Sequence, residues 1–446
     1  MSKRILINQT PEHIGEEVTL AGWIDVRRDH GKLVFFELRD RSGRLQLVVT
    51  PEKVDLIELA KEIHSEYAVT VVGQVKARPT KKSADPTVIV NPTDTIEIEV
   101  LALSVVGRPT MELPIDVSQN EMGLQLETLL NYRTLALRQK KIQAIFHVYS
   151  ELLRAYDEAM RSLGFLEIKT PKILGAATEG GANFFRIKYF DRDAYLAQSP
   201  QFYKQAAMSA YERVFEIGTV FRAEPSYTTR HTTEYTGLDA EMGFIENVEE
   251  VMAVLERVMH AMFQHISATC QADLTLFDAV IPPVVPIPRI RLSEAIEILK
   301  SKYQKEIPDG EDIDSEGERL IGDYVKEKYG SDLVFLTHYP TAVRAFYSLP
   351  SPENPKYSES YDLVFRGVEI ASGAQRIHDP ELLTEVIRAR GLDPDTFKDY
   401  IDIFRYGAPP HGGWGLGSER IIQKLLGLSS IKEAILYPRD VKRLAP

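Results

Sequence analysis

The N-terminal part of the chain alternates between apolar and polar residues, the pattern of a β-strand with one buried face. Apolar residues recur at every second position in three successive runs between Glu17 and Thr50, and further runs of the same kind follow at 67–75 and 88–105. Asp29-His30-Gly31 and Ser42-Gly43 separate the first three runs as turns. Five short strands in roughly 100 residues predict a small closed β-barrel, with a fragment of a β-sandwich as the alternative.

Two polar-face positions of these strands carry unusual residues. Phe35 is out of phase with Val34 and Phe36, and Gln46 is out of phase with Leu45 and Leu47. Five-stranded barrels of the oligonucleotide/oligosaccharide-binding (OB) fold bind single strands by stacking bases on such aromatic residues, at about 1–3 kcal/mol per base. The alternative for Phe35 is burial under a neighbouring loop.

The remainder of the chain predicts helices grouped around long strands. Residues 108–136 have no sustained period and are expected to form a hinge between a barrel domain at 1–107 and a larger domain at 137–446. Apolar residues recur at helical spacing from 142 to 163, and strand-like runs at 214–222 and 235–244 precede further helical segments near 248–268, 292–304, 315–329, 381–391 and 417–427. This order predicts an α+β domain with an antiparallel sheet flanked by helices.

Composition limits the class of protein. No run approaches the roughly 18 apolar residues of a membrane span, and the first residues lack the apolar run of a signal peptide, so we expect a cytoplasmic protein with no membrane contact. The single Cys270 excludes an internal disulfide and argues against a zinc site. A formal net charge of −12 is unusual for a nucleic-acid binder, but six Lys and Arg residues between 27 and 44 predict a local basic stripe.

The segment from Val214 to Met242 places charges on one face of two strands. Glu216, Arg222 and Glu224 share a parity on the first strand, as do Tyr235, Asp239 and Glu241 on the second. One interpretation is an outer face of salt bridges. The other is a floor that holds a charged ligand, for which the guanidinium of Arg222 suits a phosphate.

Two later segments add candidate chemistry. Asp362 and Glu369 lie among apolar strand residues near Ser372, and carboxylates of this kind suit Mg²⁺, although a structural ion pair explains them equally well. The segment 405–420, RYGAPPHGGWGLGSER, has glycines that let the backbone approach a ligand, and Arg420 begins a helix.

In this order and spacing, the segments resemble the conserved motifs of class II aminoacyl-tRNA synthetases. GFLEIKTPKIL at 164–174 resembles motif 1, FRAE with its loop and return strand resembles motif 2, and GLGSER resembles motif 3. The N-terminal barrel is similar to that of the subgroup for aspartate, asparagine and lysine. QSPQFYKQ at 198–205 and TEGGA at 178–182 are similar to the aspartyl branch of this subgroup.

The resemblance implies ATP-dependent attachment of L-aspartate to tRNA-Asp, and possible charging of tRNA-Asn stays open. Lys204 and Arg376 would contact the substrate's side-chain carboxylate, and an amide would leave one of these cations poorly paired at a cost of a few kcal/mol. The residues implied to hold the substrate ammonium are Glu179, Ser199, Gln201 and Asp239.

For ATP, the resemblance implies a role for each of several residues. Arg222 would contact the α-phosphate, Glu224 the adenine amino group and His231 the triphosphate, with the adenine ring between Tyr235 and Arg420. Asp362, Glu369 and Ser372 would hold Mg²⁺. Arg222, Glu369 and Arg420 would act in catalysis, which needs alignment and charge neutralisation and no side-chain nucleophile.

The resemblance also implies macromolecular partners. Arg28, Phe35 and Gln46 would read the anticodon of the tRNA, and Pro171 would lie at the interface of a homodimer. The nearest alternative is an asparaginyl-tRNA synthetase, which usually lacks a lysine at the position of Lys204. Two alternatives are more distant. An asparagine synthetase of the same catalytic fold generally lacks the barrel. An inactive tRNA-binding protein would have lost motif residues that are present here.

Overall fold

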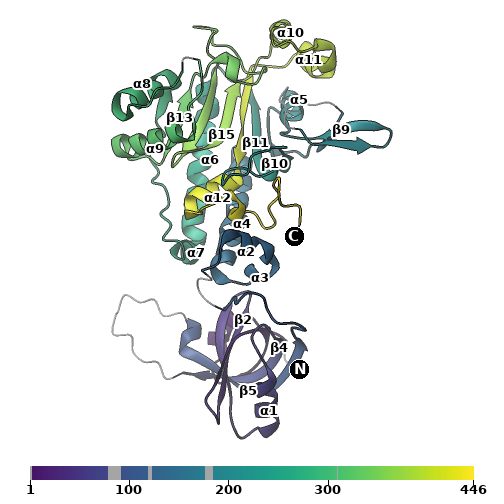
Figure 1. Ribbon diagram of the computed structural model, residues 1–446, viewed down its shortest axis with the longest axis vertical. Coiled ribbons are helices and arrows are strands. Elements are labelled where there is room, and N and C mark those ends of the chain that lie inside the picture. Colours follow the sequence, from purple (N-terminus) through teal and green to yellow (C-terminus); the bar gives the residue numbers. More distant parts are fainter. Residues whose placement is uncertain (1–2, 79–91, 119–122, 176–183, 309, 446) are drawn as a thin grey trace. The chain divides into compact units, whose positions relative to one another are not determined.

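The computed structural model divides the chain into two compact units, residues 1–123 and 124–446 (Figure 1). It describes residues 3–78, 92–118, 123–175, 184–308 and 310–445. None of the helices within these ranges is long and apolar enough to cross a membrane.

The first unit contains the predicted closed barrel. Its strands are β1 (Glu17–Asp29), β2 (Val34–Asp40), β3 (Gly43–Val49), β4 (Ala68–Ala77) and β5 (Ile96–Gly107), hydrogen-bonded in the order β1-β2-β3-β5-β4, with helix α1 (Val54–Glu62) between β3 and β4. Alternation along β2 buries Val34, Phe36 and Leu38 inside the barrel, whereas Phe35 lies on the outer face and is partly buried. The prediction of a five-stranded barrel of the OB type is therefore confirmed.

The second unit is built on a sheet of eight strands, in the order β12-β13-β14-β15-β16-β11-β10-β6. Their bounds are β6 (Leu166–Glu167), β10 (Arg213–Phe221), β11 (Glu234–Gly243), β12 (Arg289–Arg291), β13 (Leu333–Thr337), β14 (Ser360–Phe365), β15 (Val368–Gln375) and β16 (His411–Gly417). The strands from β13 to β10 pair antiparallel, and only the short edge strands β12 and β6 pair parallel. This confirms the α+β prediction.

Three helices cover this sheet and form the main core with it: α4 (Lys140–Ser162), α6 (Val248–Thr269) and α12 (Ser418–Leu426). α4 has one apolar face, and its buried residues Ile145, Val148 and Leu152 pack in the same cluster as Leu238 and Trp414 of the sheet. Residues on the opposite face of the central strands line a cavity.

Smaller elements surround the central sheet. Helices α8 (Leu292–Tyr303) and α9 (Ser315–Tyr329) lie beside β12 and β13, and a separate three-stranded sheet consists of β7 (Ile173–Leu174), β8 (Arg186–Tyr189) and β9 (Arg192–Leu196) (Figure 1). Further helices of this unit are α5 (Gln201–Tyr211), α7 (Gln271–Thr275), α10 (Pro380–Ala389) and α11 (Lys398–Arg405).

The stretch expected to be a hinge contains two short helices, α2 (Leu126–Asn131) and α3 (Arg133–Ala136), which belong to the second unit. The buried Arg133 donates hydrogen bonds to the carbonyl oxygens of Glu433, Ile435 and Leu436 near the C-terminus. Helices of one or two turns are too short to show a period in the sequence.

Candidate active site

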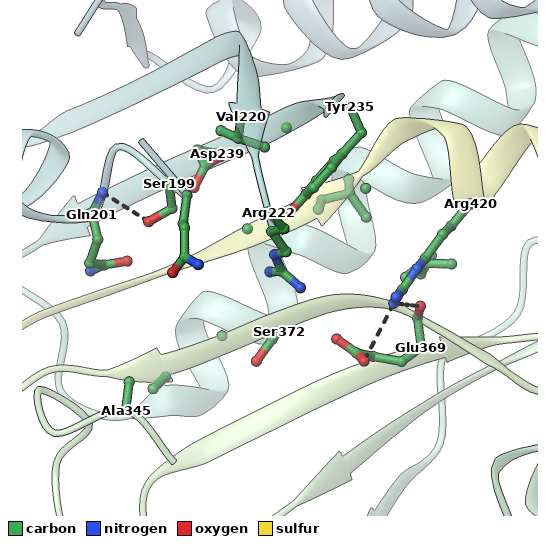
Figure 2. Close-up of a pocket in the computed structure, with 18 of the residues that line it drawn as sticks. Ser199, Gln201, Val220, Arg222, Tyr235, Asp239, Ala345, Glu369, Ser372 and Arg420 are labelled. Carbon is green, nitrogen blue, oxygen red and sulfur yellow. Dashed lines mark hydrogen bonds and ion pairs between the residues drawn. The ribbon is translucent and has the colours of Figure 1, made fainter. Parts of the chain in front are cut away.

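A cavity of about 470 Å³ opens over the face of the sheet formed by β10, β11, β15 and β16 (Figure 2). Alternation along β11 directs Tyr235, Gly237 and Asp239 into this cavity and places Leu238 and Ala240 in the core. The predicted site residues that line it are Ser199, Gln201, Lys204, Arg222, Glu224, His231, Tyr235, Asp239, Glu369, Ser372, Arg376 and Arg420. The charged strand face is therefore the floor of a cavity and not a solvated outer surface.

Glycine residues of β16 leave space for the charged side chains of the neighbouring strand β11. A Cβ atom on Gly413 would lie 2.0 Å from the carbonyl oxygen of Ala240 and 2.4 Å from the carboxylate of Glu241. Because neither group has room to move away from a side chain at this position, only glycine fits beside the buried carboxylate.

Four alternating charges form a buried cluster at one end of the cavity. The ammonium of Lys204 lies 2.9 Å from the Asp239 carboxylate and 3.6 Å from that of Glu241, and it donates to the carbonyl oxygen of Trp414 at 2.8 Å. Arg376 donates to both carboxylate oxygens of Glu241, from Nε at 2.9 Å and from Nη2 at 3.3 Å. The two cations are thus each matched by an acid, although the sequence predicted a contact with the substrate ammonium for Asp239 and no specific role for Glu241.

Burial and neighbouring charges act differently on the two acids. Burial raises the pKa of Asp239, against the opposing effect of Lys204. Burial also acts to raise the pKa of Glu241, but the charges of Arg376 and Lys204 outweigh it and hold the pKa below its ordinary value. Glu241 is therefore ionised at neutral pH and fixes both cations in place.

The other end of the cavity carries the arginines that the sequence suggested for phosphate. Arg222 follows β10 and its guanidinium reaches into the cavity, with its centre 5.5 Å from the centroid of the Tyr235 ring (Figure 2). Arg420, on the first turn of α12, donates to the backbone oxygen of Glu369 at 2.7 Å and lies 3.4 Å from its carboxylate. His231 shares a hydrogen bond of 2.7 Å with the hydroxyl of Thr228.

The three residues suggested for Mg²⁺ lie at two depths. Glu369 and Ser372 line the cavity, but Asp362 is 5% exposed and does not line it. Arg344 contacts both Asp362, at 2.7 Å, and the Ser372 hydroxyl, at 3.0 Å. The second oxygen of Asp362, Oδ1, is buried without a hydrogen-bond partner in the described part of the chain, so this carboxylate retains an acceptor for a further ligand.

The loop between β10 and β11 is fixed by residues that the sequence analysis did not single out. Arg230 lines the cavity and donates to Glu318 of α9 at 3.2 Å and to the carbonyl oxygen of Gly367 at 3.3 Å. Burial, followed by the nearby Glu369 carboxylate, raises the pKa of Glu318 to about 7. Glu318 is distant in sequence from the motif segments, and nothing in its local pattern marks it.

The alternation along β11 already indicated that Glu241 lies on the face of the cavity floor. Glu241 shares a strand face with Tyr235 and Asp239, but the sequence analysis gave it no role in the site. Arg344 had no comparable signal, because it follows the short 3-10 helix at Thr341–Val343 in a segment without a regular period.

The barrel has its own small hollow, of about 120 Å³, on its outer face. Arg28, Phe35 and Gln46 all line it, together with Glu37, Arg44 and Arg78. The ring of His30 meets that of Phe35 edge-on at 5.5 Å, and the Gln46 amide donates to Glu97 at 2.8 Å. The structure therefore brings the three residues suggested for the anticodon to one place.

The remaining suggested residues are Glu179 and Pro171. Glu179 falls outside the residues that the structure describes. Pro171, between β6 and β7, is exposed in the single chain, close to Ile173 with 48% of its surface exposed.

Comparison with known proteins identifies relatives of both units. The family model for class II tRNA synthetases (D, K and N) matches residues 125–441, and that for OB-fold nucleic acid binding domains matches residues 18–106. The chain is 43% identical to the aspartate–tRNA(Asp) ligase of Pyrococcus horikoshii, covering 98% of both chains. It is 42% identical to the aspartate–tRNA(Asp/Asn) ligase of Aeropyrum pernix, covering 97% of this chain and 96% of the relative.

Among solved structures, the asparaginyl-tRNA synthetase of Pyrococcus horikoshii complexed with asparaginyl-adenylate is similar with a TM-score of 0.90. It shares 33% sequence identity, and the match covers 100% of each chain. The fold is therefore common to enzymes named for two amino acids, and the choice between them depends on individual side chains.

Proposed function

The chain belongs to the class II tRNA synthetases of the D, K and N group, and on this premise we propose that it joins L-aspartate to tRNA at the expense of ATP. The buried cluster of Lys204, Asp239, Glu241 and Arg376 carries the proposal. The aspartate–tRNA ligases named above, at 42–43% identity, support it as well.

Lys204 and Arg376 favour a carboxylate over an amide because both side chains are donors only. Aspartate offers two acceptor oxygens and a negative charge to these two cations. The amide group of asparagine would direct an N–H toward one of them, in a region from which water is largely excluded. The similarity of the fold to an asparaginyl-tRNA synthetase favours asparagine as the substrate. That similarity does not explain why Lys204 and Arg376, which can only donate hydrogen bonds, lie together at this end of the cavity.

The chemistry that this cavity supports has two steps. The substrate's α-carboxylate attacks the α-phosphorus of ATP, pyrophosphate leaves, and a mixed anhydride forms. The terminal ribose hydroxyl of tRNA then attacks the carbonyl carbon of the anhydride, and AMP leaves. Arg222 and Arg420 stabilise negative charge that develops on the phosphate oxygens, while Lys204 and Arg376 hold the amino acid in line.

We include Mg²⁺ in the proposal as the partner of the ATP phosphates. Glu369 and Ser372 face the cavity, and the unpartnered oxygen of Asp362 lies behind them, a donor set of hard oxygen atoms that fits this ion. When bound, Mg²⁺ would supply charge neutralisation for the triphosphate.

For the macromolecular partners, we propose tRNA-Asp bound through the barrel, with Phe35 as the stacking platform beside Arg28 and Gln46. Experiment must decide whether tRNA-Asn is also charged, because one relative is named for tRNA(Asp/Asn) and the other for tRNA(Asp) alone. We propose a cytoplasmic location, because charged tRNA is consumed in translation.

A homodimer is also part of the proposal. Pro171 is exposed in a short segment that also contains the apolar residues Leu166 and Ile173, which are 43% and 48% exposed. Exposed apolar residues in one region are typical of an interface between subunits. Light scattering should give about twice the mass of one chain, and the mass of a single chain would remove this part of the proposal.

Exchange of pyrophosphate into ATP in the presence of one amino acid at a time tests the first step without tRNA. We expect exchange with aspartate and, at equal concentration, exchange lower by about a hundredfold or more with asparagine. Exchange that depends on asparagine and not on aspartate would overturn the proposal.

A further inference from the structure

A chain of hydrogen bonds runs behind the wall of the cavity, from the backbone of Pro409 to the side chain of Gln201. The His411 ring contacts the carbonyl oxygen of Pro409 through Nδ1 and the side-chain nitrogen of Gln205 through Nε2, both at 2.8 Å. The Gln205 oxygen accepts from the Gln201 amide at 2.9 Å and from the Tyr400 hydroxyl at 2.8 Å. Of these residues, only Gln201 lines the cavity.

The direction of this chain is set at Pro409. A backbone carbonyl oxygen can only accept a hydrogen bond, so Nδ1 of His411 must carry the proton that is donated to it. The His411 ring is fully buried and stacks on Phe404, with a distance of 5.7 Å between ring centroids, which holds it in this orientation.

His411 is neutral at physiological pH, which decides the role of its other nitrogen. Burial lowers its pKa to about 4; the Glu241 carboxylate opposes this shift, and the charges of Arg376 and His378 favour it. A neutral ring that donates from Nδ1 must accept at Nε2. The nitrogen of the Gln205 amide must therefore face His411, and its oxygen must face away.

The orientation of the Gln205 amide fixes that of Gln201. With its oxygen turned toward Gln201 and Tyr400, Gln205 can only accept, so Gln201 must present its NH₂ group backward. The carbonyl oxygen of Gln201 is then on the cavity side, where Figure 2 shows Gln201 next to Ser199. Its backbone N–H is held by the Ser199 hydroxyl at 3.2 Å, which fixes the start of α5.

We propose that Gln205 and His411 are positioning residues for substrate recognition, because together they force the amide of Gln201 to offer an oxygen, and not an NH₂ group, to the ammonium of the amino-acid substrate. The inference rests on the proposed function and deepens it, since it names the part of the substrate that these residues serve. An amide free to turn over would place an N–H against the ammonium for part of the time and lose a hydrogen bond to a charged group.

The test compares two small molecules that differ in the ammonium group. Aspartate has it, whereas succinate keeps both carboxylates without it. In Gln205→Leu, which removes both the acceptor for Gln201 and the donor to His411, the KM for aspartate in pyrophosphate exchange should rise about tenfold to a hundredfold. The inhibition constant of succinate should change less than about threefold, since succinate makes no use of the Gln201 oxygen.

A second variant and a control guard against misfolding. His411→Phe keeps an aromatic ring to stack on Phe404 and removes both hydrogen bonds of the imidazole, the one to Pro409 and the one that orients the Gln205 amide. It should show the same selective loss at smaller size, about threefold to tenfold. Tyr400→Phe removes the other donor to the same Gln205 oxygen and leaves the hydrogen bonds from Pro409 to Gln201 intact. The KM for aspartate and the inhibition constant of succinate should both stay near those of the unaltered protein.

Loss of aspartate and succinate binding to the same extent in both variants, or unchanged aspartate binding in both, would overturn the inference. Failure of the unaltered protein to exchange with aspartate would instead overturn the proposed function, so the two failures are distinguishable.

Discussion

Arg376 and Glu241 form an ion pair in which the guanidinium donates to both carboxylate oxygens, at 2.9 and 3.3 Å, and the two side chains are only 4% and 0% exposed. The pair joins β15 to β11 across the glycine-rich strand β16. It gives Arg376 a fixed direction before any substrate binds, which is the preorganisation that a specific binding site requires.

The first prediction concerns this pair. Glu241→Gln leaves Arg376 and Lys204 with one buried negative charge between them, and an uncompensated buried charge typically costs about 3–5 kcal/mol. Denaturant unfolding should therefore show a loss of that order. Glu158→Gln breaks an exposed ion pair with Arg154 and should change the unfolding free energy much less, because water screens that pair. Equal, small losses in both variants would contradict the assignment of Glu241 as the anchor of the cluster.

A second prediction separates the two substrates. Lys204→Met keeps much of the side-chain volume and removes the cation, so the KM for aspartate should rise by about a hundredfold or more, while the KM for ATP should change less than about threefold. Lys169→Met removes a lysine that is 66% exposed, and both constants should stay unchanged. An unchanged KM for aspartate in Lys204→Met would remove Lys204 from the amino-acid site.

The third prediction tests the barrel. Phe35→Ala removes the proposed stacking platform, and the loss of about 1–3 kcal/mol per stacked base should raise the KM for tRNA by roughly fivefold to a hundredfold. Pyrophosphate exchange without tRNA should not change. Tyr329→Ala, at the end of α9, removes another exposed aromatic as a control. Parallel losses in charging and in exchange would show that the Phe35 variant is misfolded and that the platform is unsupported.

The fourth prediction is a pH dependence of stability. The pKa of His411 is lowered from 6.5 to about 4 in the folded chain. As the pH falls below 6.5, the unfolded chain takes up a proton that the folded chain does not, so the free energy of unfolding decreases. The loss is complete only below about pH 4, where the folded chain is protonated as well. Between about pH 7.5 and pH 5 the unaltered protein should lose about 2 kcal/mol more than His411→Phe. Identical pH profiles for the two proteins would show that His411 is not buried in its neutral form.

Much of the fold and of the cavity could be predicted because parity persists along paired antiparallel strands. The same rule that buries Val34 and Phe36 in the barrel puts Tyr235 and Asp239 together on the cavity floor. Parity predicts which face of the sheet a residue lies on but not how deeply it is buried. It therefore could not show that Asp362 lies behind the cavity wall, although its partner Ser372 across β14 and β15 lines the cavity.

Other parts of the site depend on contacts between residues far apart in the sequence. The distance from Gln205 to His411 is 206 residues along the chain, and from Arg230 to Glu318 it is 88. Each of these residues is an ordinary polar residue in its own segment. The packing of α5 against β11 brings Gln205 to His411, and the packing of α9 against β15 brings Glu318 to Arg230.

We infer that the buried cluster of Lys204, Asp239, Glu241 and Arg376 selects aspartate for attachment to tRNA. Charging of tRNA-Asp and tRNA-Asn transcripts with labelled aspartate and, separately, labelled asparagine, in the presence of ATP and Mg²⁺, tests it most directly. We expect labelled aspartate on tRNA-Asp and no labelled asparagine on either tRNA. Labelled aspartate on tRNA-Asn as well would identify an enzyme of broader tRNA range. Attachment of asparagine, or of neither amino acid, would contradict it.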